Sequence, residues 1–279
     1  MDYRKKFRVE PGERVKLAEI DPGQTGKHVT EEEAGPQLAA DSERLALLQA
    51  RLWAEHERSL LIVLQAMDAG GKDGTVKHVF SSVDPAGVSV FSFKVPTPQE
   101  HAHDFLWREH RVAPGAGEIA IFNRSHYEAV LVERVHDLVP KKVWSKRYDR
   151  INDFEKLLVQ SGTVILKFFL HISADEQLHR FGARLDDPEK QWKISDSDYT
   201  ERERWGDYQD AYADLLERCS TEHAPWYIIP ANHKWFRTLA VARILVDTLE
   251  EMDPHYPKPS VDIEAIRRRY HAAETAASD

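Results

Sequence analysis

Residues 60–80 read LLIVLQAMDAGGKDGTVKHVF, and this stretch decides the fold. Residues 60–65 form an apolar run too short for a helix, so they predict a buried strand. Two glycines follow, and a segment of helical pattern begins near Lys72. A strand, a glycine-bearing turn and a helix that starts on lysine have the form of a phosphate-binding loop, with two departures. Ala66 replaces the first glycine of that motif, and Asp73 replaces the Ser or Thr that holds magnesium.

The backbone and the charges of this loop suit a bound phosphate. Gly70 and Gly71 let the chain curl until successive N–H groups face one anion, and the positive end of the next helix adds to the attraction. Lys72 supplies a mobile positive charge. An ordinary strand-to-helix turn is the alternative, but the flanking strand and helix favour phosphate binding. The predicted loop comprises Ala69, Gly70, Gly71, Lys72, Asp73, Gly74 and Thr75.

Two carboxylates, Asp68 and Asp73, belong to the same loop. Carboxylates repel a bare phosphate, so they are tolerated only beside metal ions or strong cations. We therefore expect Asp68 to bind Mg²⁺, with Mn²⁺ as the alternative ion, or to orient an acceptor oxygen. For Asp73 a simpler role is favoured, as a negative charge at the start of a helix.

Four further apolar runs of strand length follow, and amphipathic stretches of helical length lie between most of them. Such alternation predicts a three-layer α/β/α fold with a central parallel sheet, in which ligands bind beyond the carboxyl ends of the strands. The four runs are VSVFSFKV at 88–95, EIAIFN at 118–123, TVILKFFLHI at 163–172 and WYIIPA at 226–231.

We divide the chain into an N-terminal arm and helix at 1–57, a core at 58–253 and a C-terminal tail at 254–279, whose Ala/Ser-rich end is expected to be frayed. The arm is expected to be extended, and a capping box at Thr30 and Glu33 starts the first helix. Polar helices at about 173–222 separate two core strands and predict a lid. Other helices are predicted after Pro98, through Phe105, Leu106 and Trp107, from Asp149 to Gln160, and near Trp235 to Met252.

The composition limits the class of protein. The chain has 279 residues and a formal net charge of −9, which argues against binding of nucleic acid or of an anionic membrane. A single cysteine, Cys219, excludes an intrachain disulfide, and a cytoplasmic location is expected. The start, MDYRKKFRVE, lacks the apolar run of a secretory signal, and no stretch approaches the roughly 20 apolar residues of a membrane span.

Asn123 and Arg124 follow a predicted strand, within the sequence FNRSHYE. Nucleotide kinases keep an acidic partner of magnesium at this location. Asn123 is neutral but still orients a water or a donor, and Arg124 is able to clamp oxyanions. Together with the loop MDAGGKDGT, the stretch FKVPTPQEHAHDFLWR and the lid sequence RFGARLDDPEKQWKIS, these residues make the chain resemble the polyphosphate kinase 2 family, from about Arg4 to Met252.

The resemblance implies a thymidylate-kinase-like P-loop core with a helical lid, assembled as a homodimer or homotetramer. It implies magnesium-dependent, in-line transfer of the terminal phosphate of inorganic polyphosphate to an adenine nucleotide, reversible in principle, with guanine nucleotides as a further class. The Asn-Arg-Ser sequence, where many members have Asp-Arg, resembles the class III branch, which phosphorylates both AMP and ADP.

The resemblance also assigns site residues by position. The predicted catalytic group is Asp68, Lys72, Asn123 and Arg124. The predicted polyphosphate group in the lid is Arg180, Arg184, Lys190 and Lys193, in which the two arginines stand four apart and should face the same way on a helix. Candidates for holding the acceptor nucleotide, which do not come from the resemblance, are Lys94, Arg108, Arg111, Glu128 and Arg134.

The sequence leaves other interpretations open. His101 and His103 begin a metallohydrolase motif, but no CxxC or HExxH supports zinc. An ATP-dependent nucleoside monophosphate kinase would have Ser or Thr after Lys72, and loss of Lys72 or Asp68 would have favoured a non-catalytic polyanion-binding module. The basic run KKVWSKRYDR at 141–150 is interpreted as a solvated face rather than a polyphosphate groove.

Overall fold

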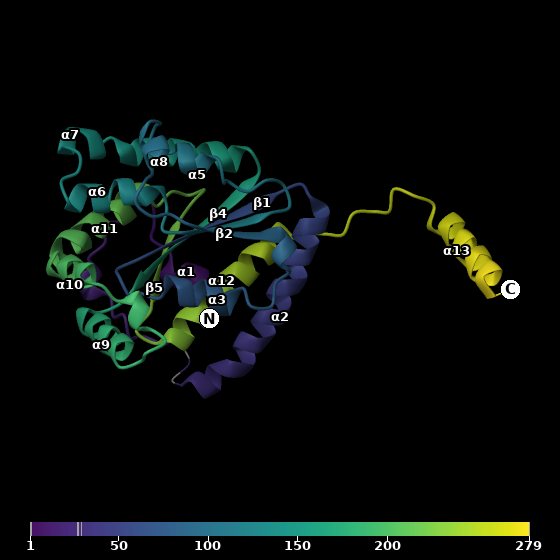
Figure 1. Ribbon diagram of the computed structural model, residues 1–279, viewed down its shortest axis with the longest axis horizontal. Helices are drawn as coiled ribbons and strands as arrows, with labels where there is room; N and C mark the ends of the chain where they lie inside the picture. The colour runs from purple at the N-terminus through teal and green to yellow at the C-terminus, as the bar shows by residue number, and fades with distance from the viewer. Residues whose placement is uncertain (1, 27, 29, 279) are drawn as a thin grey trace.

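A five-stranded parallel sheet forms the centre of the computed structural model, which describes residues 2–26, 28 and 30–278 (Figure 1). The strands run in the spatial order β2-β3-β1-β4-β5, and each neighbouring pair is parallel. The predicted parallel sheet is therefore confirmed, and each predicted apolar run supplies one strand. The strands are β1 (Ser59–Ala66), β2 (Val88–Ser92), β3 (Ile119–Asn123), β4 (Thr163–His171) and β5 (Trp226–Pro230).

The burial of the strands explains why their sequences lack an alternating pattern. Every residue of β1 and β3 is buried, because helices cover both faces of the sheet. The strand β2 is only partly buried and ends at Ser92, which suits its position at the sheet edge. The lysine at 94, predicted to continue this strand, lies beyond its end and is exposed.

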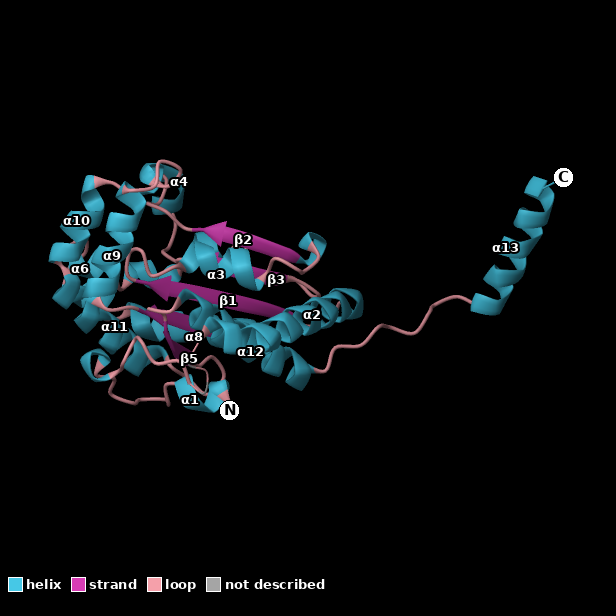
Figure 2. Ribbon diagram, turned by 90° about the horizontal axis from the view of Figure 1, so that it is seen from below, coloured by secondary structure: helices cyan, strands magenta, loops and turns pink. Residues whose placement is uncertain are grey.

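Helices form the two outer layers (Figures 1 and 2). One face of the sheet carries α2 (Glu31–Glu55), α3 (Lys72–Val79) and α12 (Lys234–Met252), which pack on one another. The other carries α8 (Arg147–Gln160) and α11 (Trp205–Cys219). The helix α2 begins with the predicted capping box: the Thr30 N–H donates to Glu33 at 3.1 Å, and the Glu33 N–H donates to the Thr30 hydroxyl at 3.2 Å.

Shorter elements connect these layers. Between β4 and β5 the chain forms four helical segments, where the lid is predicted, and α13 lies beyond the core at the C-terminal end. The shorter elements are α1 (Tyr3–Phe7), η1 (Leu17–Glu19), η2 (Pro85–Gly87), α4 (Pro98–His101), α5 (Trp107–His110), η3 (His126–Ala129), α6 (Val132–Val135), α7 (Lys141–Trp144), α9 (Ala174–Leu185), η4 (Gln191–Lys193), α10 (Asp196–Glu203) and α13 (Ile263–Ser278).

The N-terminal arm is not wholly extended as predicted. Residues 3–7 form α1, whose Tyr3 and Phe7 are buried and pack edge-on against Phe236 of α12. An antiparallel bridge joins Arg8 to Tyr227 of β5. The arm thus packs on its own core, and tertiary burial rather than local pattern decides its structure. The proposed three-part division of the chain stays a prediction.

Two other predicted segments differ from the structure. The helix expected after Pro98 is split into α4 and α5, because Asp104 accepts a hydrogen bond from the Leu106 N–H at 3.0 Å in a turn that interrupts it. The tail is not frayed throughout: residues 263–278 form α13, whose alanine-, glutamate- and arginine-rich sequence favours a helix, and it projects away from the body (Figures 1 and 2). Across the described residues, no helix is both long and apolar enough to cross a membrane.

Candidate active site

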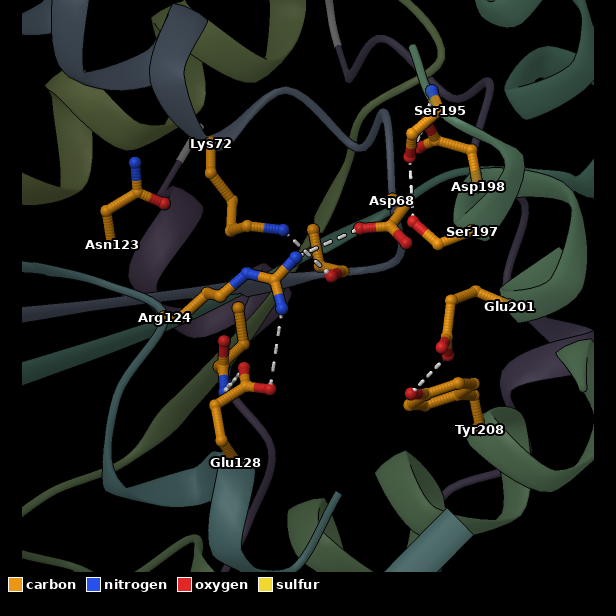
Figure 3. A network of polar contacts seen from close by, with 12 residues as sticks. Asp68, Lys72, Asn123, Arg124, Glu128, Ser195, Ser197, Asp198, Glu201 and Tyr208 are labelled. Carbon is orange, nitrogen blue, oxygen red and sulfur yellow. Dashed lines mark hydrogen bonds and ion pairs between the residues drawn. The ribbon is translucent and has the colours of Figure 1, made fainter. Parts of the chain in front are cut away.

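The carboxyl ends of β1 and β3 bring the two predicted motifs together. These strands are parallel neighbours in which Leu64 pairs with Asn123, and the Arg124 N–H donates to the Leu64 carbonyl at 3.1 Å. The loop after β1 and the Asn-Arg pair at the end of β3 therefore lie together at the carboxyl ends of the strands (Figure 3). Open α/β sheets bind ligands at the carboxyl ends of their strands.

The loop after β1 presents backbone N–H groups to this edge. Gly71, at the N-terminal cap of α3, has φ +99°, a conformation that favours glycine, and Ala69 has φ +58°. Within the described chain no side chain caps α3 at Gly71; the Thr75 hydroxyl instead donates to the Gly71 carbonyl at 3.1 Å. The first-turn N–H groups of α3 are thus available to an anion, as the predicted loop requires.

Lys72 lies in this loop with little to balance its charge. Its Nζ donates to the Ala66 carbonyl at 3.1 Å, and the side chain makes no ion pair shorter than 4 Å within the described residues. Burial, reinforced by the charge of Arg124, lowers the pKa of Lys72 to about 8, although Asp68 and Glu128 oppose that shift. A phosphate beside Nζ would favour the charged amine, so the site is arranged to gain from an anion.

Arg124 connects the second motif to the loop. Its backbone is left-handed with φ +63°, and its guanidinium contacts Asp68 Oδ1 at 3.2 Å and Glu128 Oε2 at 3.7 Å. Glu128 and Asp68 raise the pKa of Arg124 in spite of its burial. Figure 3 shows that the Arg124 guanidinium and the Lys72 amine end beside each other, so two cations face one space. That arrangement can hold phosphate oxygens from two directions.

Asn123 contacts the loop directly. Its amide nitrogen donates to Asp73 Oδ1 at 2.7 Å and so fixes the first turn of α3 to the end of β3. The predicted helix-dipole role of Asp73 is compatible with this bond, because Asp73 lies in the first turn of α3. A carboxylate at position 123 would face Asp73 across the same contact, so the neutral amide relieves a charge repulsion.

The donor set fits a hard divalent cation that is shared with phosphate groups. Asp68 and Asp73 offer carboxylate oxygens, and Mg²⁺ usually takes one or two carboxylates together with substrate phosphates. In the described part of the chain no three His, Cys, Asp or Glu side chains gather closely enough to hold a metal ion by themselves. The zinc interpretation of His101 and His103 is not supported, because His103 stacks on Trp107 at 3.9 Å between ring centres.

The lid arginines differ from the expected pair. Arg180 is buried: its Nη1 donates to the Ala69 carbonyl at 2.8 Å, and its Nε donates to Glu176 at 2.7 Å. Arg184 instead donates to the Lys193 carbonyl at 3.3 Å. Arg180 therefore fixes the loop to the lid, while Arg184 holds the lid together. The other two predicted lid cations are exposed, with Lys190 beside Asp187 and Lys193 over the ring of Trp192.

The predicted acceptor residues do not form one group. Arg108 donates to the Lys94 carbonyl at 2.8 Å, and Arg111 is exposed with its guanidinium over Trp107. Arg134 donates to Asp214 at 2.7 Å and is tied into the packing around α11. Of the five predicted residues, Glu128 lies beside the predicted catalytic residue Arg124, which it contacts at 3.7 Å, and it accepts a hydrogen bond from Gln65. The basic run at 141–150 is mostly exposed, as the sequence indicates.

Two features of the site were not predicted. Tyr208 of α11 donates to Glu201 of α10 at 2.6 Å, and Glu201 also contacts His136 at 2.9 Å; Figure 3 shows Tyr208 and Glu201 opposite Arg124. Burial and the bond to Glu201 raise the pKa of Tyr208. Arg237 of α12 lies almost fully buried against Gly71. Its only signal in the sequence was an arginine within the apolar run WFRTLAVARILV, which also contains Arg243.

Comparison with known proteins identifies the family. The sequence model of Polyphosphate kinase 2 (PPK2) matches residues 28–257. The chain belongs to the polyphosphate kinase 2 family. Its predicted membership is thereby confirmed.

Curated relatives and solved structures agree with this assignment. The chain is 52% identical over 263 residues to an AMP/ADP-polyphosphate phosphotransferase of Meiothermus ruber, covering 94% of this chain and 98% of that protein. It is 44% identical to an ADP-polyphosphate phosphotransferase of Rhodopseudomonas palustris, covering 91% and 92%. The crystal structure of Polyphosphate Kinase 2 from Arthrobacter aurescens TC1 matches with a TM-score of 0.94 at 44% identity, covering 98% of this chain and 97% of that one.

Proposed function

We propose that the chain transfers the terminal phosphate of inorganic polyphosphate to AMP and to ADP, giving ADP and ATP in a reaction that is reversible in principle. One observation carries this proposal: Lys72 and Arg124 face a single space at the open N-terminal turn of α3. No hydroxyl follows Lys72 to hold an ATP-bound magnesium, so a phosphate polymer fits the donor side better than ATP. The acceptors follow from the names of relatives that are 52% and 44% identical.

The residues of the loop bind and orient the donor. The free N–H groups of α3 and the Lys72 amine hold the phosphate groups at the reacting end. The position of Arg124, between Asp68 and Glu128, lets its guanidinium neutralise charge on the phosphoryl group as it moves in line toward the acceptor. Such positioned charges supply several powers of ten in rate in phosphoryl transfer, on the order of 10³ for one arginine.

The acceptor side needs no strong base, because the attacking oxygen of AMP or ADP is already ionised. Asp68 therefore orients the acceptor or contributes to a metal site, rather than removing a proton. Asp68 and Asp73 are the residues that would hold Mg²⁺, and the ion, when bound, neutralises phosphate charge. The lid segment between β4 and β5 excludes water from the reacting groups and so suppresses hydrolysis. A homodimer or homotetramer and a cytoplasmic location stay predictions.

The decisive experiment supplies ADP, Mg²⁺ and polyphosphate without ATP and follows ATP by luciferase. ATP formation supports the proposal. Binding of polyphosphate without turnover would favour a polyanion-binding module, and activity only with ATP and AMP would favour a nucleoside monophosphate kinase. Parallel assays with AMP alone and ADP alone test the acceptor range, for which the Asn-Arg-Ser sequence predicts use of both.

A further inference from the structure

Arg237 is a buried cation pressed against the phosphate-binding loop. It lies in the first turn of α12 with 2% of its surface exposed. A Cβ atom at Gly71 would lie 1.9 Å from its Nη1, and a Cβ at Gly74 would lie 3.2 Å from its Nη2. The guanidinium therefore occupies the space that the two glycines leave open, at the positive end of α3.

Nothing in the described chain balances this charge. The Nε of Arg237 is buried without a hydrogen-bond partner. Burial, together with the charge of Arg180 beside it, lowers the pKa of Arg237 to about 10, and no carboxylate opposes that shift. The first turn of α12 contains no acidic residue either. A buried cation in such surroundings is costly to the folded state unless an anion joins it.

The neighbouring cations show that this is a separate side of the loop. Arg180 already has its partners, in Glu176 and the carbonyls of Ala69 and Ala231. Lys234 is exposed, and partial burial with the charges of Arg180 and Arg237 lowers its pKa. The Lys72 amine ends beside Arg124 (Figure 3), whereas the Arg237 guanidinium lies against Gly71 and Gly74. The loop therefore has two cationic sides.

We propose that Arg237 and Lys234 form a second phosphate subsite, which binds groups of the polyphosphate donor behind its reacting end. An extended polyanion is the ligand chemistry that spans two separate cationic sides of one loop, whereas a single phosphate group occupies only one of them. This subsite rests on the proposed function. The Arg237 guanidinium is buried and preformed, so it holds a phosphate group in one position. The Lys234 amine is exposed, so it contacts the polyphosphate at the protein surface.

The test compares two substitutions on one helix. Arg237→Met removes the unpaired charge at similar length. Arg243→Met is the matched control, because Arg243 lies six residues further along α12 and is paired with Asp41 at 3.0 Å and with Asp247. Initial rates are measured with long-chain polyphosphate, with tripolyphosphate and with varied ADP, and melting temperatures are measured with and without polyphosphate.

For Arg237→Met we expect the KM for long-chain polyphosphate to rise at least tenfold, the KM for ADP to stay within about twofold, and the loss to be smaller with tripolyphosphate. The empty variant should melt no lower than the wild type, and its melting temperature should respond less to polyphosphate. Arg243→Met should melt lower and keep both KM values. Arg237→Lys should recover part of the donor affinity.

An unchanged KM for polyphosphate in Arg237→Met, or a lower melting temperature with both KM values intact, would show that Arg237 only packs the helix and would overturn the inference. A wild-type enzyme that makes no ATP from polyphosphate would instead overturn the proposed function. In that case the polyphosphate-induced melting shift, compared between wild type and Arg237→Met, still decides whether the subsite exists.

Discussion

Lys167 and Arg237 are both buried cations, but their surroundings differ. Lys167 of β4 is fully buried, and its amine donates to Glu155 at 2.5 Å, to the Tyr127 hydroxyl at 2.9 Å and to the Cys219 carbonyl at 2.6 Å. Burial alone would raise the pKa of Glu155, yet Lys167 and His126 hold it below its usual value. Arg237, by contrast, has no carboxylate partner among the described residues.

The difference distinguishes charged side chains that stabilise the fold from charged side chains that bind a ligand. A buried ion pair with its hydrogen bonds satisfied joins the elements that carry it, here β4 with α8 and α11. An unpaired buried cation does not stabilise the folded state. Its presence beside an anion-binding loop therefore indicates that it binds an anionic ligand. Lys72 is half-buried and resembles Arg237 in lacking an ion pair, since its only described hydrogen bond goes to a backbone carbonyl, although the carboxylates of Asp68 and Glu128 act on its pKa. Five predictions test this separation.

The largest effect is expected at Lys72. Lys72→Ala removes a cation that contacts the moving phosphate, so kcat/KM for ATP formation from polyphosphate should fall by about 10³-fold or more. The melting temperature of the empty protein should not fall, because no ion pair is lost. Lys77→Ala, in the exposed last turn of α3, is the control and should keep full activity. An active Lys72→Ala variant would remove the loop from the mechanism.

Glu155→Gln should have the opposite profile. The substitution leaves Lys167 buried without a counter-charge, so the free energy of unfolding should fall by about 3–5 kcal/mol in urea denaturation. The variant should keep its KM for polyphosphate when assayed at a temperature where it is folded. Glu250→Gln, which loses the half-exposed pair with Arg44 and a 3.8 Å contact with Arg243, should change stability by less than about 1 kcal/mol. Similar losses in both variants would contradict the proposed role of the buried pair.

The pH dependence of the stability of the ligand-free enzyme should depend on the protonation of Lys72. Its folded pKa is about 8, whereas the ordinary lysine value is 10.5. Between these values the unfolded chain holds a proton that the folded enzyme has released, so this group makes folding more favourable as pH rises from about 8. The melting temperature of wild type minus that of Lys72→Met should therefore increase from pH 8 to 10.

Substrate binding should depend on the same proton. A bound phosphate favours the charged amine, so the KM for polyphosphate should increase above pH 8, by at most about tenfold per pH unit for one proton. Below pH 7 the KM should be insensitive to this group. A KM that stays flat from pH 7 to 9.5 would show that the Lys72 amine does not meet the donor.

The smallest effect is expected for Asn123→Asp. The new carboxylate would face Asp73 Oδ1 across a contact of 2.7 Å, so the variant should lose about 1 kcal/mol of stability in EDTA. Added Mg²⁺ should restore that loss, and the Mg²⁺ concentration for half-maximal activity should change a few-fold. Asn152→Asp, which loses the bond from its amide to the Arg218 carbonyl at 2.9 Å, should lose stability that added Mg²⁺ does not restore. A metal-independent loss of stability would argue against carboxylates sharing an ion here.

Much of the fold was readable because buried parallel strands leave a simple signal. Each strand is a short apolar run, and the capping box at Thr30 marked the start of α2. The missed parts depend on interactions that such runs do not encode. The helix α1 exists because Tyr3 and Phe7 find a buried place against α12, and the split after Pro98 depends on one turn at Asp104.

The site was predicted where it follows directly from strand ends. Asp68, Lys72 and Arg124 come just after β1 and β3, and parallel neighbours bring such positions together. The lid was less predictable. Helical spacing placed Arg180 and Arg184 on one face, but it could not show that Arg180 would donate a hydrogen bond to the Ala69 carbonyl. Arg237 was missed because its partner loop lies more than 150 residues earlier in the chain.

The unbalanced guanidinium also bears on how long each molecule survives. Anything that binds only the folded form raises its stability in proportion to the logarithm of its concentration, and unfolded molecules are those that proteases remove. In a protein with an unpaired buried cation, a bound anion also removes the cost of that charge and so adds to the stability of the folded form. Under the proposed function, the folded protein should therefore resist proteolysis better with the phosphate polymer than without it.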